Sequence, residues 1–176
     1  MTEAENTASK SIKSLVAQLA GLLEHGGGML TSGDVAALRR MDPAKPAAAF
    51  FKLAGVVLDR ELGSSAHREQ METKWASIIV GLAHLGALHR AHEQLGQALV
   101  RADYSELRFS RLLRADAARL VDELPALARF LTAKVVHVDW SDAARLMLST
   151  GGPNEESVRR RLARDYYRAL AGTVTT

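Results

Sequence analysis

The chain of 176 residues contains no cysteine and only four prolines, and aromatic residues make up 5% of it. The lack of cysteine excludes disulfide bridges, thiol nucleophiles and cysteine-ligated metal centres. No apolar run approaches the roughly 18 residues of a membrane-spanning helix, and the first residues lack the apolar segment of a secretory leader. With 47% hydrophobic and 24% charged residues, the composition is that of a folded globular protein, which we expect to be cytoplasmic.

The sequence patterns of common enzymes are also missing. A run of three glycines at 26–28 follows a predicted helix and has no lysine after it, so it does not match a phosphate-binding loop. His84, His89 and His92 lie close together but lack the HExxH spacing of a zinc site. No Ser–His–Asp set can be chosen from spacing, because such triads are defined by geometry. We therefore expect no catalytic residues, no metal and no cofactor.

Arginine is the most informative of the residues that are present. The formal net charge is only +3, but 17 of the 23 basic residues are arginine. Five arginines fall within residues 101–119 against three acids, and five fall within 157–170 against one. The planar guanidinium group matches phosphate oxygens better than a lysine ammonium does. These clusters therefore favour an anionic polymer, that is, a nucleic acid, as the partner.

Apolar residues recur at helical spacing in almost every segment, whereas only residues 135–138 have the composition of a strand. Four residues do not make a sheet, so the predicted fold class is all-α. We expect a single domain over residues 1–176, built as a compact bundle of about eight helices. The bundle is expected to consist of two packed halves, residues 9–95 and 104–171.

Three local features predict helix boundaries. The polar residues 64–70 predict a loop before a long helix. Pro125 lacks a backbone N–H and predicts a break or a kink in the helix that Asp116 caps. Asp139 is typical of a helix N-cap and predicts a helix that continues through Ser149.

The arginines of each cluster fall on one face of a predicted helix. Arg160, Arg164 and Arg168 recur every four residues and form one stripe on the last helix. Leu162 and Tyr166 fall on the opposite face, which we expect to be buried. The earlier cluster repeats every three residues, as Arg108, Arg111 and Arg114. Cations spaced about 6 Å apart along a helix match the phosphates of a nucleic-acid strand.

The run SELRFSRLLRAD (Ser105 to Asp116), preceded by QLGQAL (Gln94 to Leu99), resembles the central signature of the CasB family. Three further pieces occur in that family's order, namely SGDVAALRRM (32–41), VDW (138–140) and VRRRLARDYY (158–167). Together they cover most of the chain, so the resemblance is to a whole protein. The CasB family is the small subunit of Cascade, the type I-E CRISPR surveillance complex.

This resemblance implies a non-catalytic subunit that serves antiviral defence within Cascade. The implied partners are the guide RNA, the target DNA and its displaced non-target strand, the backbone and large subunits of the complex, and a second copy of this chain. Base pairing reads the sequence in such a complex, so protein cations need only bind phosphates to stabilise the R-loop. The candidate nucleic-acid-binding residues are Arg39, Arg40, Arg108, Arg111, Arg114, Arg119, Arg159, Arg160, Arg161 and Arg164.

Two other functions are compatible with the sequence. A helical DNA-binding regulator would need a recognition helix with base-reading Asn or Gln residues, which the arginine-rich segments almost lack. A purely scaffolding subunit would bind acidic surfaces of partner proteins through the same arginines. A single arginine can also be structural, and the alternative for Arg108 is that it pairs with an acid such as Asp139 and contacts no phosphate. For Trp75, Trp140 and Tyr166 we expect core packing rather than stacking on bases.

Overall fold

The computed structural model describes residues 3–25, 28–63 and 65–174. Over these ranges the chain is helical, and its only bridge between extended residues joins His89 to Val138. The all-α prediction is therefore confirmed. The helices are α1 (Glu3–His25), α2 (Ser32–Arg39), α3 (Ala48–Leu53), α4 (Ser65–Leu85), α5 (Leu95–Arg101), α6 (Glu106–Arg114), α7 (Ala117–Ala133), α8 (Ser141–Ser149) and α9 (Glu155–Val174). A π-helical turn, η1 (Ala54–Leu58), extends α3, and a 3-10 turn, η2 (Gly86–Leu88), follows α4.

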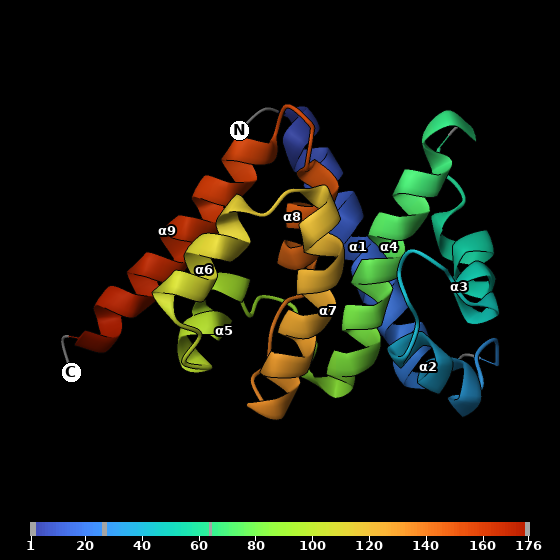
Figure 1. Cartoon of the computed structure of the whole chain (residues 1–176), viewed down its shortest axis with the longest axis horizontal. Coiled ribbons are helices and arrows are strands. Elements are labelled where there is room, and N and C mark those ends of the chain that lie inside the picture. Colours follow the sequence, from blue (N-terminus) through green and yellow to red (C-terminus); the bar gives the residue numbers. More distant parts are fainter. Residues whose placement is uncertain (1–2, 26–27, 64, 175–176) are drawn as a thin grey trace.

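The helices assemble around α4 and α7, which form the most extensive helix pair (Figure 1). α1 lies against both α4 and α8, and α2 packs against α4. α5 packs against α9 at one end of the molecule, whereas α3 lies at the other end (Figure 1). The buried apolar side chains form one continuous core that runs from Val16 in α1 to Tyr166 in α9.

Trp140 anchors the middle of this core. Its ring is fully buried, and its Nε1–H donates a hydrogen bond of 3.0 Å to the carbonyl oxygen of Ile78 in α4. A Cβ atom on Gly81 would lie 2.3 Å from the ring atom Cζ2, so only glycine lets α4 approach the indole this closely. Trp75 is buried as well, as expected for a core residue.

Tyr166 performs the same role at the α9 end. Its hydroxyl donates to the carbonyl oxygen of Tyr104 at 2.7 Å, and its ring stacks on Phe109 with centroids 3.8 Å apart. A Cβ atom on Gly96 would lie 2.6 Å from the Tyr166 backbone nitrogen, which explains the close contact between α5 and α9. The expected core position of this tyrosine is confirmed, since the residue is 1% exposed.

The predicted loop at 64–70 is wrong, because α4 already begins at Ser65. Residues 67–70 are polar, but the segment 65–70 contains no glycine or proline, so nothing in its backbone opposes a helix. Arg68 and Glu72 support this first part of α4 with an ion pair of 3.2 Å one turn apart. Polarity here marks an exposed helical segment and not a break.

Of the break or kink predicted at Pro125, the break does not occur, because α7 continues through it from Ala117 to Ala133. Proline at this position removes the N–H that would bond to the carbonyl of Val121. The hydroxyl of Ser77 in α4 donates to that carbonyl instead, at 2.8 Å. A partner from another helix thus replaces the lost intrahelical bond.

The predicted caps of α7 and α8 lie at or next to the observed helix starts. The carboxylate of Asp116 accepts the N–H of Arg119 at 2.8 Å and caps α7, as predicted. α8 begins at Ser141, and the residue at the cap position is Trp140. Asp139, one residue earlier, accepts the N–H of Ser141 at 3.0 Å. Asp139 therefore helps to start α8 from just outside the predicted position.

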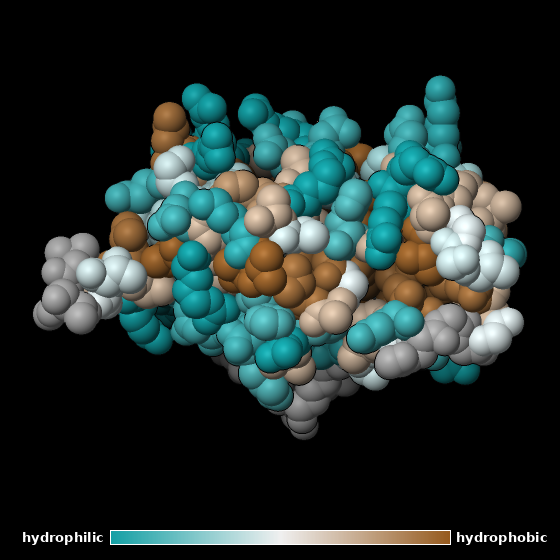
Figure 2. Space-filling view, turned by 90° about the horizontal axis from the view of Figure 1, so that it is seen from below, coloured by the Kyte–Doolittle hydropathy of each residue, from teal (hydrophilic) through white to brown (hydrophobic). Residues whose placement is uncertain are grey.

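Apolar side chains also reach the surface of the molecule. Figure 2 views the molecule from below the orientation of Figure 1 and shows them as brown areas between hydrophilic side chains. The turn that ends α7 exposes Val135 by 71%. This valine has a φ of +54°, a conformation that β-branched residues rarely adopt. The turn is stabilised by a hydrogen bond of 3.1 Å from the N–H of Val136 to the carbonyl of Leu131.

Candidate nucleic-acid interface

The central arginine cluster lines a groove between α6 and α7. Arg108 and Arg111 of α6 and Arg119 of α7 border this α6–α7 groove, and Tyr104 and Phe130 form part of its wall. All three arginines are exposed. α6 starts where the hydroxyl of Ser105 accepts the N–H of Arg108, so a side-chain cap fixes the register that points these residues outward.

One acid lies within the α6–α7 groove. Glu123 borders it, and its carboxylate lies 3.4 Å from Nε of Arg119, one turn away on α7. Arg119 is still 58% exposed at its side chain, so this pair costs little to separate. The alternative partner of Arg108 is engaged elsewhere, because Asp139 accepts the N–H groups of His92 and Ser141.

A second groove lies on the other side of α7. Arg39 and Arg40 at the end of α2 and Arg129 of α7 border this α2–α7 groove, together with Asp42 and Asp122. The arginines bring three positive charges against two negative ones. The groove therefore retains a small excess of positive charge.

The arginines of the α2–α7 groove differ in how firmly their side chains are held by hydrogen bonds. Nε of Arg39 donates to the carbonyl oxygen of Ala83 in α4 at 2.7 Å, which holds this side chain near the end of α4. Arg40 and Arg129 are exposed. Arg129 was not among the sequence candidates, because it stands alone in an alanine- and leucine-rich stretch. Its place on the exposed face of the amphipathic segment 117–133 is the signal that could have identified it.

α7 therefore separates two arginine-lined grooves. Ala126 borders the groove on the α6 side, and Pro125 borders the groove on the α2 side. The arginines come from segments that are distant in the sequence, at positions 39–40, 108–111 and 119–129. The fold thus collects along one helix several of the candidates that the sequence presents separately.

α9 carries a separate row of arginines, which we call the α9 stripe: Arg160, Arg164 and Arg168. All three are exposed, whereas Leu162 and Tyr166 on the opposite face are buried. Nε of Arg160 lies 2.7 Å from the carboxylate of Glu156, one turn earlier, and both side chains are more than two-thirds exposed. The amphipathic arrangement predicted for this helix is observed.

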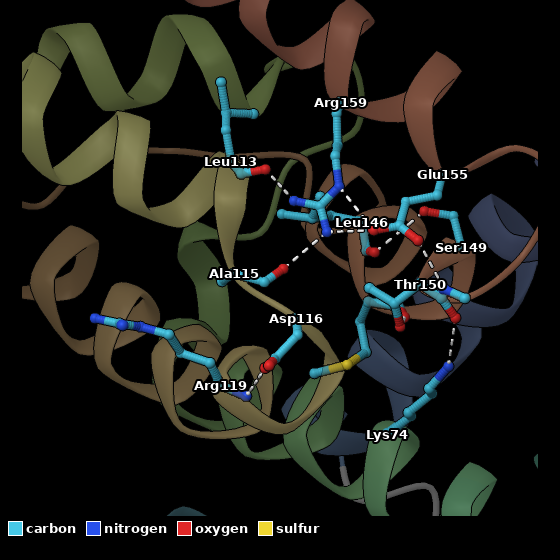
Figure 3. Close-up of polar contacts among 12 residues, drawn as sticks. Lys74, Leu113, Ala115, Asp116, Arg119, Leu146, Ser149, Thr150, Glu155 and Arg159 are labelled. Atoms are coloured by element: carbon cyan, nitrogen blue, oxygen red, sulfur yellow. Dashed lines mark hydrogen bonds and ion pairs between the residues drawn. The ribbon is translucent and has the colours of Figure 1, made fainter.

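Two other arginines of α9 have different surroundings. Arg161 lies 4.0 Å from Asp165 and borders a cavity between α8 and α9 that Asp142 and Arg145 also line. Arg159 points to the end of α6 and is only 13% exposed at its side chain (Figure 3). Neither guanidinium is as open to solvent as that of Arg160.

His84 and His89 lie in partly buried positions inside the fold. Nδ1 of His89 accepts the backbone N–H of Trp140 at 3.2 Å, and burial lowers the pKa of this imidazole. Burial also lowers the pKa of His84, and the charge of the nearby Arg129 adds to that effect, whereas a hydrogen bond with the backbone of Arg39 opposes it. Within the part of the chain that the structure describes, no three His, Asp or Glu residues are grouped closely enough to hold a metal ion.

The chemistry that these surfaces offer is the binding of phosphates by guanidinium groups. The grooves and the α9 stripe present exposed arginines, and two of these, Arg119 and Arg160, lie next to a single glutamate on the same helix. Among the described residues, no helix combines the length and the apolar character that crossing a bilayer requires. The arrangement fits an extended anionic partner that touches several helices.

Comparison with known proteins gives one match. Residues 34–167 match the family model described as CRISPR-associated protein Cse2. No curated protein and no solved structure matches the chain. The matched range includes all three arginine-bearing surfaces except Arg168 at the far end of the α9 stripe.

Proposed function

Since this chain belongs to the Cse2 (CasB) family, the non-catalytic small subunit of the type I-E CRISPR complex Cascade, we propose that its arginine-rich surfaces bind nucleic-acid backbone in that complex. The bound chains are the guide RNA, the target DNA and the displaced non-target strand. A second copy of this chain and the backbone and large subunits are the protein partners. The result is a more stable R-loop.

The observation that carries this proposal is the pair of grooves on either side of α7. Arg108 and Arg111 stand on one side, and Arg40 and Arg129 stand on the other. These guanidinium groups come from three helices and are exposed. Phosphates of one strand are repeated at short intervals, so a surface with several separated cations can bind more than one of them.

The proposed binding does not depend on base sequence. The exposed aromatic side chains among the described residues are Phe51 and Tyr167, which are 50% and 45% exposed. Neither borders an arginine-lined groove, and of the two only Tyr167 lies on the helix that carries the α9 stripe. Ring stacking on bases is therefore a minor contribution, and guanidinium–phosphate contacts supply the affinity.

Modest affinity is sufficient for this role. Replacing a DNA duplex by a guide–target heteroduplex is close to balanced in free energy, so a few backbone contacts shift the equilibrium. The displaced strand has lost its base-pairing partner and is available to such contacts. The small excess of positive charge in the grooves fits this requirement.

A binding experiment with the full chain tests the proposal. We expect weak binding to single-stranded oligonucleotides, equal for different sequences, with a steep loss of affinity as salt rises. Replacing Arg108 and Arg111 by glutamine lowers the affinity. The matched control replaces Arg60 and Arg68 by glutamine, because these arginines lie outside the grooves and the α9 stripe.

Two results would contradict it. Tight binding to one duplex sequence that survives high salt would indicate a regulator. An absence of binding at low salt, with normal assembly into Cascade, would indicate a purely scaffolding subunit whose arginines bind acidic protein surfaces.

A further inference from the structure

Arg159 joins the end of α6 to the start of α9 (Figure 3). Its guanidinium donates to the carbonyl oxygens of Leu113 and Ala115, the latter at 2.7 Å. Nε and Nη2 also contact Oε1 of Glu155 at 3.0 and 2.5 Å. We call this set of contacts the Arg159 clamp.

These contacts leave Arg159 little capacity for a phosphate. A guanidinium has five N–H donors, and the clamp uses four of them. A bidentate phosphate contact needs two free, adjacent donors, so the geometry offers none. With 13% of its side chain exposed, Arg159 also contrasts with its neighbour Arg160, which is 74% exposed.

The carbonyls that the clamp binds lie immediately before and after Arg114. Leu113 is in the last turn of α6, where carbonyl groups lack intrahelical partners. A cation at this end of the helix is also favoured by the helix dipole. The backbone of Arg114 is therefore fixed on both sides to a residue of α9.

The α9 side of the clamp is fixed as well. The second carboxylate oxygen of Glu155 accepts the N–H of Gly151 at 2.7 Å, and this bond together with Arg159 lowers the pKa of the carboxyl. One residue earlier in the same turn, the carbonyl of Thr150 accepts a hydrogen bond from the buried Lys74 of α4 at 3.2 Å. The clamp is thus continuous with α4 and α8.

We propose that Arg159 is a positioning residue, which binds no phosphate itself and holds Arg114 of α6 at a fixed place relative to the α9 stripe. Arg114 and Arg160 then bind one phosphate backbone together across the junction of α6 and α9. This inference rests on the proposed function. It separates Arg159 from the other candidate arginines by role.

A double-mutant cycle with Arg114→Gln and Arg159→Gln tests the proposal in the full chain, with a mixed-sequence single-stranded oligonucleotide as the probe. Arg114→Gln is expected to reduce affinity several-fold when Arg159 is present, and by a smaller factor when it is absent. A residue that only stabilises the fold would leave the effect of Arg114→Gln the same in both backgrounds. Arg159→Lys, which keeps a donor, is expected to restore part of the coupling.

The salt dependence of oligonucleotide binding shows whether Arg159 instead contacts a phosphate directly. If Arg159→Gln lowers the log–log salt slope by about 0.7 and leaves the effect of Arg114→Gln unchanged, then Arg159 contacts a phosphate directly. That result overturns the proposal. Arg160→Gln is the positive control for that result, since it removes an exposed arginine that is proposed to bind phosphate and leaves the clamp intact.

A second measurement does not depend on nucleic-acid binding. The chain has no cysteine, so cysteines at the exposed Leu107 of α6 and Ser157 of α9 can carry a pair of spin labels. Arg159→Gln is expected to broaden the distance distribution between the labels, and Arg160→Gln is expected to leave it unchanged. An unchanged distribution in Arg159→Gln would overturn the proposal. If no variant binds nucleic acid but the distribution broadens, the proposed function fails and the clamp stands as a structural element.

Discussion

The hydroxyl of Ser77 in α4 donates to the carbonyl oxygen of Val121 in α7 at 2.8 Å, one turn before Pro125. Ser77 is fully buried, and the carbonyl that it reaches is the one that the proline leaves without an intrahelical donor. The proline and the serine therefore form a matched pair between the two helices that pack most extensively.

Ser77→Ala is expected to lower the free energy of unfolding by about 1 kcal/mol, because it leaves a partly buried carbonyl without its side-chain partner. Chemical denaturation monitored by circular dichroism measures this change. In a Pro125→Ala background the alanine N–H can bond to Val121, so the same serine substitution should cost less. An equal cost in both backgrounds would contradict the pairing.

The close contact of α5 with α9 predicts the effect of a single methyl group. Gly96→Ala places a Cβ atom 2.6 Å from the Tyr166 backbone nitrogen, so α9 must shift. We expect a loss of about 1–3 kcal/mol in thermal or chemical unfolding, typical of overpacking.

Gly21→Ala is the matched control for Gly96→Ala. Gly21 lies inside α1 with no atom within 4 Å of the Cβ position, so alanine should stabilise the helix by up to about 1 kcal/mol. Equal effects of the two substitutions would show that α5 and α9 are not in close contact.

The lowered pKa of His89 predicts how the stability of the fold depends on pH. Its Nδ1 accepts the N–H of Trp140 only when unprotonated, and burial lowers its pKa below the ordinary value of 6.5. The neutral imidazole is thus favoured in the folded state. Its contribution to stability is complete above pH 6.5 and declines as the pH falls through the lowered pKa.

Melting temperatures measured between pH 7.5 and about pH 5 check this prediction. His89→Asn keeps an acceptor for Trp140 without titrating, so its stability should fall less at low pH. His84 has a lowered pKa as well, so a smaller decline remains in that variant. The exposed His67 provides the control, and a His67→Asn variant that matched His89→Asn would contradict the assignment.

Much of the fold could be predicted from the sequence, because helical spacing and the cap residues are local signals. The buried face of α9 at Leu162 and Tyr166 and the cap at Asp116 followed from such signals. The continuation of α7 through Pro125 could not be predicted from local signals, because the serine that compensates for the proline lies 48 positions earlier in another helix. A local rule was overridden by a contact that only the folded chain contains.

The candidate interface shows the same limit. The sequence identified exposed arginines such as Arg111 and Arg160 because they repeat along one helical face. It could not separate Arg159 from them, since the acceptors of Arg159 are backbone carbonyls of α6. Nor could it place Arg129 beside Arg40, because that neighbourhood depends on how α2 packs next to α7.

The ion pair between Arg160 and Glu156 predicts that removal of an acid increases affinity. Both side chains are mostly exposed, so Glu156→Gln should lower the melting temperature only slightly, through the loss of one acid in the first turn of α9. It frees the guanidinium and removes a repelling carboxylate, so binding to a single-stranded oligonucleotide should strengthen. Glu69→Gln, at an exposed acid of α4 outside the α9 stripe, is the control. Weaker or unchanged binding by Glu156→Gln would place the nucleic acid away from α9.

The central claim is that these arginines hold nucleic-acid backbone inside Cascade. It is tested most directly by the protection of the displaced strand from a single-strand nuclease in target-bound complexes. The paired glutamine variants remove Arg108 with Arg111, Arg40 with Arg129, or Arg160 with Arg164, and the control removes Arg60 with Arg68. We expect at least one of the three pairs to reduce protection while the subunit and the guide RNA stay in the complex. If all three variants assemble and protect the strand as the parent and the control do, the arginines do not hold that strand.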